Sequence, residues 1–245
     1  MTQIGANQSS ANQIYWVADN VISSDFPDVE RALTDPDGLL AIGGDLNSER
    51  VLDAYRRGIF PWYSQGQPIL WWSPDPRCVL EPDKLLISRS LRKTLRKGSF
   101  RVTFNQAFPA VIKACGEPRR AGGETWITAE VLQAYTALHY AGHGVSVECW
   151  LGEHLAGGLY GLAIGKVFFG ESMFSRANDA SKVALVHLAH AMRQRNFRLL
   201  DCQIHSEHLQ SLGAVLMPRP RFTSILNRSC SRPETRDWPA ESLLP

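Results

Sequence analysis

Alternating hydrophobic and polar positions are clearest in the middle of the chain, where the two-residue period is typical of β-strands. Three such segments follow one another: VSVECW, HLAGGLYGLAIG and KVFFGESMF. The connections between them, at Gly152-Glu153 and at Gly165, are short enough to join antiparallel neighbours directly. The pattern therefore predicts a meander of three antiparallel strands.

The hydrophobic period changes after the meander. Apolar residues three and four positions apart predict a helix from about Asp179 to Arg195, with a strand, FRLLDCQI, behind it. A short helix, SEHLQSLG, begins at Ser206. Three strands, a helix and a strand are the core order of the GNAT-type acyltransferase fold, so we predict an α+β domain of this kind. If the helix is a crossover, FRLLDCQI lies beside KVFFGESMF.

Helix signals also occur in the first half of the chain. Asn47 or Ser48 is a plausible cap for SERVLDAYRRG, which ends at Gly58. Two more helices are predicted, one capped by Asn105 and one capped by Thr128. Loop-like segments rich in Pro, Gly and Asp surround the first helix, which indicates a small separate unit.

These patterns divide the chain into four parts. Residues 1–13 are polar and are expected to be disordered. Residues 14–76 form a small N-terminal domain packed on the GNAT-like domain of residues 77–232, and residues 233–245 are expected to be a flexible tail. The segment GEPRRAGGE is predicted to be a loop.

An aromatic segment, GIFPWYSQGQPILWWSPDPR, carries Trp62, Tyr63, Trp71 and Trp72 among its four prolines. Aromatic residues on proline-stiffened loops serve either as packing between domains or as a platform on which a base or ring stacks. The sequence leaves both interpretations open.

Composition limits the possible partners. With 245 residues, 44% hydrophobic and 20% charged, the chain has the profile of an ordinary globular protein. No apolar run approaches the ~20 residues of a membrane span and no secretory leader is evident, so we expect a cytoplasmic protein without membrane contact. The five cysteines are odd in number and contain no CxxC motif, which favours neither a disulfide framework nor a zinc site.

A net charge of only +2 means that any nucleic-acid contact is local. One segment, SRSLRKTLRKGSFR, fits such a contact, because five of its cations follow one another before Gly98 without an acid. Ser88 or Ser90 is a plausible cap for a helix that carries them. A solvated helix face and a phosphate-binding surface are the two interpretations. The cations are Arg89, Arg92, Lys93, Arg96 and Lys97.

Two carboxylates stand out because each lies in an apolar strand. Glu171 follows Gly170 at the end of the apolar run VFFG, and it needs either a structural partner such as Arg176 or a charged ligand. Asp201 precedes Gln203 by two positions, which places both on one face of a regular strand. That pair either caps the following helix or carries chemistry. Two pairs of histidines are spaced three residues apart, His187 with His190 and His205 with His208. No motif adds a third ligand to either pair, so we expect no metal.

The sequence resembles the leucyl/phenylalanyl-tRNA–protein transferase family. The resemblance runs from about Phe26 to Leu226 through consecutive motifs. The motifs are GLLAIGGDL, YRRGIFPWYS, PILWWSPDPR, ETWIT, GGLYG, FFGESMFSRANDASK, LLDCQ and HLQSLGA. The resemblance implies transfer of leucine or phenylalanine, and less well methionine, from tRNA to proteins that begin with Arg or Lys, marking them for degradation.

The resemblance also implies roles for individual residues. Asp201 and Gln203 match the catalytic pair, Glu171 the carboxylate near the acceptor's basic N-terminus, and Trp62 and Trp126 the site of the terminal adenosine. The basic segment matches a tRNA contact. The expected amino-acid pocket consists of Leu159, Phe168, Gly170, Leu185, Leu188, Met192 and Leu200.

The donor in such a reaction is an activated ester, so we expect no cofactor, no metal and no ATP. A monomer is expected. Two rival functions remain: a non-catalytic tRNA- or peptide-binding module on the same scaffold, and an N-acyltransferase that uses coenzyme A. The turn SRANDAS, which lacks glycine, disfavours coenzyme A, because GNAT enzymes bind its pyrophosphate on a glycine-rich turn before the helix.

Overall fold

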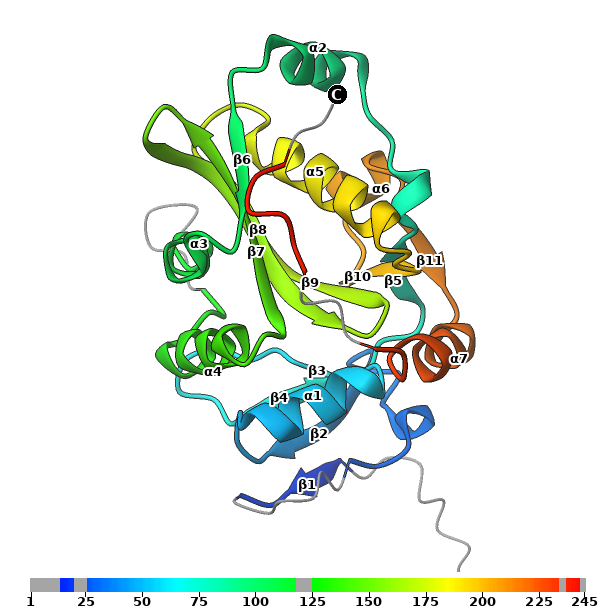
Figure 1. Ribbon diagram of the computed structural model, residues 1–245. Helices are drawn as coiled ribbons and strands as arrows, with labels where there is room; N and C mark the ends of the chain where they lie inside the picture. Colours follow the sequence, from blue (N-terminus) through cyan, green and yellow to red (C-terminus); the bar gives the residue numbers. More distant parts are fainter. Residues whose placement is uncertain (1–13, 20–25, 118–124, 234–236, 243–245) are drawn as a thin grey trace, which may run out of the picture.

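The chain forms two β-sheets with helices around them in the computed structural model, which describes residues 14–19, 26–117, 125–233 and 237–242 (Figure 1). The segment predicted to be disordered, 1–13, and most of the predicted loop GEPRRAGGE lie outside the described residues. The first sheet has four strands in the order β1-β2-β4-β3. They are β1 (Tyr15–Val17), β2 (Leu39–Gly43), β3 (Phe60–Pro61) and β4 (Leu70–Trp72).

The second sheet has seven strands in the order β11-β5-β10-β9-β8-β7-β6. β7, β8 and β9 form the predicted antiparallel meander, and β10 returns parallel to β9 after a helical crossover, as expected. The strands are β5 (Arg77–Leu80), β6 (Arg101–Phe104), β7 (Gly144–Leu151), β8 (His154–Ile164), β9 (Val167–Ser175), β10 (Leu199–Gln203) and β11 (Val215–Met217).

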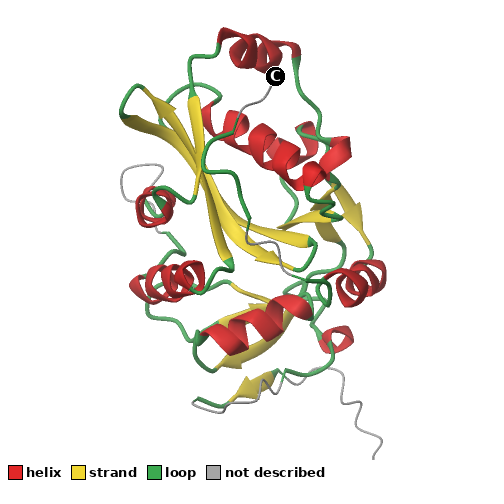
Figure 2. Ribbon diagram, viewed as in Figure 1, coloured by secondary structure: helices red, strands yellow, loops and turns green. Residues whose placement is uncertain are grey.

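Helices cover both faces of the second sheet. Figure 2 shows α5 along one face, with α3 and α4 near the other and the first sheet with α1 beyond α4. The α-helices are α1 (Ser48–Arg56), α2 (Arg89–Lys97), α3 (Phe108–Cys115), α4 (Ala129–Tyr140), α5 (Ala180–Gln194), α6 (Glu207–Ser211) and α7 (Arg219–Ser229). Two short 3₁₀ helices are η1 (Val29–Arg31) and η2 (Pro82–Lys84).

Side-chain caps begin four of these helices where the sequence predicted them. Asn47, Ser88, Thr128 and Ser206 each accept a hydrogen bond from a first-turn amide. The prediction for Asn105 was wrong, because its side chain instead accepts from the Ser146 amide on β7.

A buried carboxylate replaces the missing cap of α3. Glu148, on β7, accepts from the backbone amides of Gln106 and Ala107 just before the helix, at 3.4 and 3.3 Å. A carboxylate at a helix N-terminus is favourable because the unpaired amides there carry partial positive charge. The tertiary fold therefore provides a cap that the local sequence does not contain.

Alternation along the strands builds two hydrophobic layers. Tyr160, Leu162 and Phe169 face α1, α3, α4 and the first sheet, so one continuous core joins the two sheets. Leu159, Phe168 and Leu200 belong to the second layer, under α5. The chain passes from the first sheet to the second between β4 and β5.

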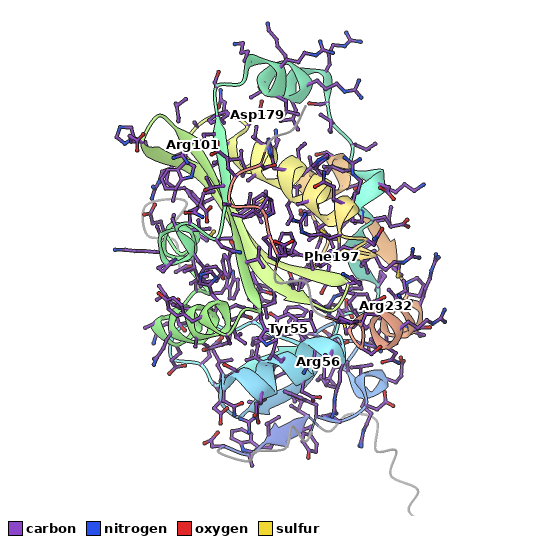
Figure 3. The ribbon with its side chains drawn as sticks, in the orientation of Figure 1. Tyr55, Arg56, Arg101, Asp179, Phe197 and Arg232 are labelled. Atoms are coloured by element: carbon purple, nitrogen blue, oxygen red, sulfur yellow. The ribbon has the colours of Figure 1, made fainter. Side chains whose placement is uncertain are left out.

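The C-terminal segment 237–242 is not loose, and the prediction of a flexible tail was wrong for these residues. Trp238 packs against Phe104, Phe168 and Phe197, with ring centroids 5.8, 6.1 and 5.4 Å away. The Ser242 amide donates to the Val102 carbonyl on β6 at 2.9 Å. Figure 3 shows Phe197 beside this C-terminal segment. One large aromatic residue provides enough apolar contact to order a polar segment.

Candidate active site

The parallel strands β9 and β10 separate in the middle of the second sheet. They pair only from Val167 to Phe169 on the β9 side. Directly afterwards each strand has a β-bulge against its other neighbour, with Glu171 the extra residue in β9 and Cys202 in β10. Bulges re-aim side chains and interrupt pairing. Two bulges at one level therefore open the sheet where both predicted site segments end.

A cavity of about 810 Å³ occupies this opening and is lined from both faces of the sheet. Met173 and six of the predicted pocket residues make its apolar part, and Met192 does not line it, since its side chain is fully buried in the core under α5. The predicted residues that line the cavity are Leu159, Phe168, Gly170, Leu185, Leu188 and Leu200. Trp126, Glu171 and Gln203 line the polar part.

Glu171 is the acidic group of the cavity. The hydroxyl of Tyr55, which Figure 3 labels, donates to its Oε1 at 2.6 Å, and the Tyr135 hydroxyl lies 2.6 Å from that of Tyr55. Burial raises the pKa of Glu171 to about 8, against the lowering effect of the tyrosine hydrogen bonds. The predicted alternative partner is engaged elsewhere, because Arg176 pairs with Glu117 at 2.7 Å. Arg176 also lines the cavity, but among the described residues Glu171 forms no ion pair with it or with another cation.

Asp201 is fully buried and forms a bidentate ion pair with Arg77. The guanidinium Nε and Nη2 donate to the two carboxylate oxygens at 2.8 and 2.7 Å. Arg77 itself lies between the Phe60 and Phe222 rings, 4.7 and 4.8 Å from their centroids. A bidentate pair that is also stacked is held in one geometry. Asp201 is thus a fixed point beneath the cavity.

The position of Gln203 depends on Asp201. Its backbone amide donates to Asp201 Oδ1 at 3.0 Å, and its side-chain Nε2 donates to Glu171 Oε1 at 3.2 Å. The expectation that Asp201 and Gln203 share a face of a regular strand was wrong, because the bulge lies between them and Gln203 has φ +57°. Neither residue caps the next helix, which Ser206 does. The bulge turns the Gln203 amide toward Glu171.

Two tryptophans line a smaller hollow of about 110 Å³ beside Glu171 and Gln203. Trp62 is 43% exposed, and its carbonyl accepts from the Trp72 indole at 2.7 Å. Trp126 lines both this hollow and the main cavity. The packing interpretation of the aromatic segment holds for Trp71 and Tyr63, which are buried in the core. The stacking interpretation stays a prediction for Trp62.

The basic helix α2 lies away from the cavity, which none of its residues lines. Its Thr94 donates to Asp179 just before α5 at 3.0 Å, which fixes the helix on the body of the protein (Figure 3). Leu91 is buried, and the five predicted cations are all exposed. The helix therefore presents a free positive face.

Sequence reasoning missed four residues of the site. Tyr55 and Tyr135 occur in amphipathic helices, where a tyrosine among apolar residues predicts only core packing. Arg77 follows a proline-rich turn, and Cys202 lies between two better candidates. Nothing local marks them, because their roles come from contacts across the fold.

Comparisons with known proteins agree on one family. The model of the leucyl/phenylalanyl-tRNA protein transferase matches residues 79–227, and that of its N-terminal domain matches residues 44–75. A protein named leucyl/phenylalanyl-tRNA–protein transferase from Aromatoleum aromaticum is 58% identical over 89% of this chain and 92% of its own length. One of the same name from Pseudomonas syringae is 55% identical over 89% and 95%.

Solved structures are more distant. A functionally unknown protein from Staphylococcus epidermidis has a TM-score of 0.38 at 9% identity over 74% of this chain and 68% of its own. L-PGS from Bacillus licheniformis has a TM-score of 0.41 at 9% identity over 76% and 71%. Similarity this low carries no argument about fold or function.

The mixed α/β fold, the substrate-sized cavity and the relatives define an aminoacyltransferase. More particularly, the chain belongs to the leucyl/phenylalanyl-tRNA–protein transferase family, as its sequence resemblance indicated, and its donor is an aminoacyl-tRNA. Among the helices of the described segments, none is long and apolar enough to cross a membrane.

Proposed function

We propose that this enzyme moves leucine or phenylalanine, and less readily methionine, from tRNA to the α-amino group of proteins that begin with arginine or lysine. One observation carries the proposal. A single cavity joins an apolar compartment under α5 to a partly buried carboxylate on the other face of the sheet. The apolar compartment suits an uncharged side chain, and the carboxylate suits a cation.

The donor enters with its amino-acid side chain toward the apolar compartment. Trp62 and Trp126 then lie where the terminal adenosine stacks, beside Glu171 and Gln203. The tRNA body extends to α2, whose exposed cations neutralise backbone phosphates. Recognition is thus divided between the amino acid, the 3′ end and the body of the tRNA.

The acceptor is selected by charge. At rest, the raised pKa leaves Glu171 largely protonated near neutral pH, which avoids burying an unpaired anion. A guanidinium or ammonium from the first residue of the acceptor brings a compensating charge and lowers the pKa of Glu171. An acceptor with an uncharged first residue leaves either an empty site or a buried lone charge.

Peptide-bond formation needs alignment more than a strong base. With a pKa of about 7.7–8.0, an appreciable fraction of the α-amino group is neutral near pH 7.5. Its nitrogen attacks the ester carbonyl, the new C–N bond forms, and the bond to the ribose oxygen breaks; that oxygen takes up a proton that the amine loses. Gln203 holds the reactants by hydrogen bonds, since an amide is hardly basic. Asp201 acts through Gln203, as a positioning residue.

We also propose that the second sheet is a GNAT-like domain, supported by the meander, the crossover helix α5 and the separation of β9 from β10. Coenzyme A is disfavoured as donor. Asp179, at the start of α5, places a carboxylate where GNAT enzymes bind pyrophosphate, and the glycine-rich turn is missing. Intact Asp201 and Gln203 argue against a non-catalytic module.

A new N-terminal leucine or phenylalanine would mark the acceptor for degradation, and we place this reaction in the cytoplasm, where charged tRNA is available. The test is transfer of labelled leucine from charged tRNA to two versions of one protein, beginning with Arg or with Met. Transfer to the Arg form alone supports the proposal. Equal labelling of both contradicts acceptor selection, and Glu171→Gln should abolish the difference.

A further inference from the structure

Two thiols meet at the edge of the cavity. β5 and β10 are neighbours in the second sheet (Figure 1), and Cys78 on β5 lies opposite Gln203, next to the bulge residue Cys202. The side chains of Cys78 and Cys202 hydrogen-bond to each other, and both are free thiols. The bulge brings the two together, because it inserts Cys202 as an extra residue beside the partner of Cys78.

We propose that Cys78 and Cys202 form a redox site at which a small peroxide reversibly stops aminoacyl transfer by making a disulfide. One sulfur attacks the peroxide, whose O–O bond breaks, to give a sulfenic acid and one water. The second thiol displaces the sulfenic oxygen as another water. Each sulfur loses one electron, and hydrogen peroxide takes up both. This site lies beyond the proposed function.

Access and acidity divide the two roles. Cys202 is partly exposed and lines both the main cavity and the tryptophan hollow, whereas Cys78 is fully buried. The hydrogen bond from Cys202 lowers the pKa of the Cys78 thiol, whereas the same hydrogen bond and burial raise the pKa of the Cys202 thiol. Cys78 therefore carries the thiolate and attacks the peroxide, which reaches the pair past Cys202 in the cavity wall. Cys202 then resolves the sulfenic acid.

A disulfide here would disturb the catalytic strand. Its sulfurs must approach to about 2.05 Å, closer than hydrogen-bonded thiols. Cys202 lies between Asp201 and Gln203, and Gln203 already has a left-handed backbone, φ +57°. Moving Cys202 toward β5 therefore shifts the Gln203 amide away from Glu171. The expected result is loss of transfer with the fold intact.

The remaining cysteines serve as internal comparisons. Burial raises the pKa of Cys149 and of Cys230 to about 12, which leaves them as unreactive thiols. Cys115 also lines the main cavity, but it lies at the end of α3 and not on β5 or β10. Cys115→Ala is thus a matched control for a cavity thiol outside the pair.

The test treats the reduced enzyme with hydrogen peroxide and then measures leucine transfer from charged tRNA and maps the alkylated peptides by mass. The wild type and Cys115→Ala should lose most of their activity and regain it with dithiothreitol. Their Cys78 and Cys202 peptides should be linked, two hydrogens lighter than the free pair. Cys78→Ala should retain its basal activity, give no linked peptide and resist the same dose.

Three results overturn the proposal: no linked peptide in the wild type, a linked peptide without loss of transfer, or Cys78→Ala inactivated as fast as the wild type. The peptide mapping is independent of the acceptor protein used. A wrong acceptor specificity therefore leaves the linked peptide unchanged, which separates failure of this proposal from failure of the proposed function.

Discussion

Asp201 shows how one fully buried residue in the wall of the cavity holds the residues around it in place. Its carboxylate receives two bonds from Arg77 and one from the Gln203 amide, all without exposure to solvent. A buried ion pair adds little net stability, but removing one partner alone is costly, at about 3–5 kcal/mol. The geometry around Gln203 and the stability of the sheet are therefore tied to one carboxylate.

Asp201→Asn should lower transfer by roughly 10²-fold, because the Gln203 amide and Arg77 lose the charge that fixes them and the reactants are no longer aligned. It should also lower the free energy of unfolding, measured in urea. The apolar pair Asp201→Leu with Arg77→Met should recover stability but not transfer, since it restores packing without the acceptor for Gln203. If the apolar pair recovers transfer as well, Asp201 has a structural role only.

Glu171 should give the enzyme an unusual pH dependence of stability. Its pKa is about 8 in the folded protein, against about 4.3 for an unfolded Glu. Between these values the folded state binds more protons, so stability falls as pH rises, by up to about 1.4 kcal/mol per pH unit. Glu171→Gln should remove this slope in urea unfolding between about pH 5 and pH 8.

The matched control is Glu153→Gln, which changes an exposed glutamate in the turn between β7 and β8. It should leave the pH dependence of the wild type unchanged. A constant difference in stability between wild type and Glu171→Gln over the same range would show that the Glu171 carboxyl titrates as in water.

At the scale of elements, α2 is a docked cationic surface. Neutralising Arg92, Lys93 and Arg96 to Gln should weaken binding of charged tRNA and flatten its salt dependence, by a slope of about 0.7–0.9 for each phosphate that the helix no longer neutralises. Puromycin-like small donors, which lack the tRNA body, should react almost as before. Equal weakening with both donors would show an effect on folding or chemistry instead.

Three exposed cations elsewhere provide the control. Lys113 on α3 with Arg221 and Arg228 on α7, all changed to Gln, give the same change in net charge. Their removal should affect tRNA binding less than the α2 change does. Both variants weaken the long-range electrostatic attraction equally, because it depends on the total charge, but only the α2 variant removes cations at the proposed contact. A similar effect from both triple variants would mean that α2 makes no local contact.

At the scale of the whole molecule, we expect the apolar compartment to decide which amino acid is transferred. Leucine and phenylalanine are slim at Cβ and widen at Cγ, whereas isoleucine and valine are already broad at Cβ. Gly170 lines the cavity where β9 leaves β10, and we expect a neck there to admit the first pair and exclude the second. Because one methylene is worth only about 1–3 kcal/mol, discrimination should be tens- to a few hundred-fold.

Methionine, slim at Cβ and flexible, should be a third and poorer donor. Transfer from Leu-, Phe-, Met-, Ile- and Val-tRNA at equal concentrations measures the order. Isoleucine transferred as well as leucine would place the pocket elsewhere. The six predicted residues that line the apolar compartment carry no polar side chain, so shape is their only means of selection.

Local patterns determined much of this protein in advance. The meander, the crossover helix, the parallel return strand and four helix caps follow from period and from capping chemistry, which act within a few residues. The motifs also indicated the family, and six of the seven residues that they placed in the pocket line the cavity. These local predictions are correct because, in a natural sequence, local preferences and tertiary contacts favour the same structure.

Only the tertiary structure decided the site itself. Two bulges open the sheet, Arg77 crosses from β5 to hold Asp201, and Tyr55 and Tyr135 meet Glu171 from two helices. Trp238 orders a C-terminal segment that is polar by composition. Each depends on residues far apart in sequence, where burial and hydrogen-bond satisfaction across the fold outweigh local preference. Hydrophobic period and helix caps indicate where strands and helices lie. They do not indicate where two neighbouring strands of a sheet separate.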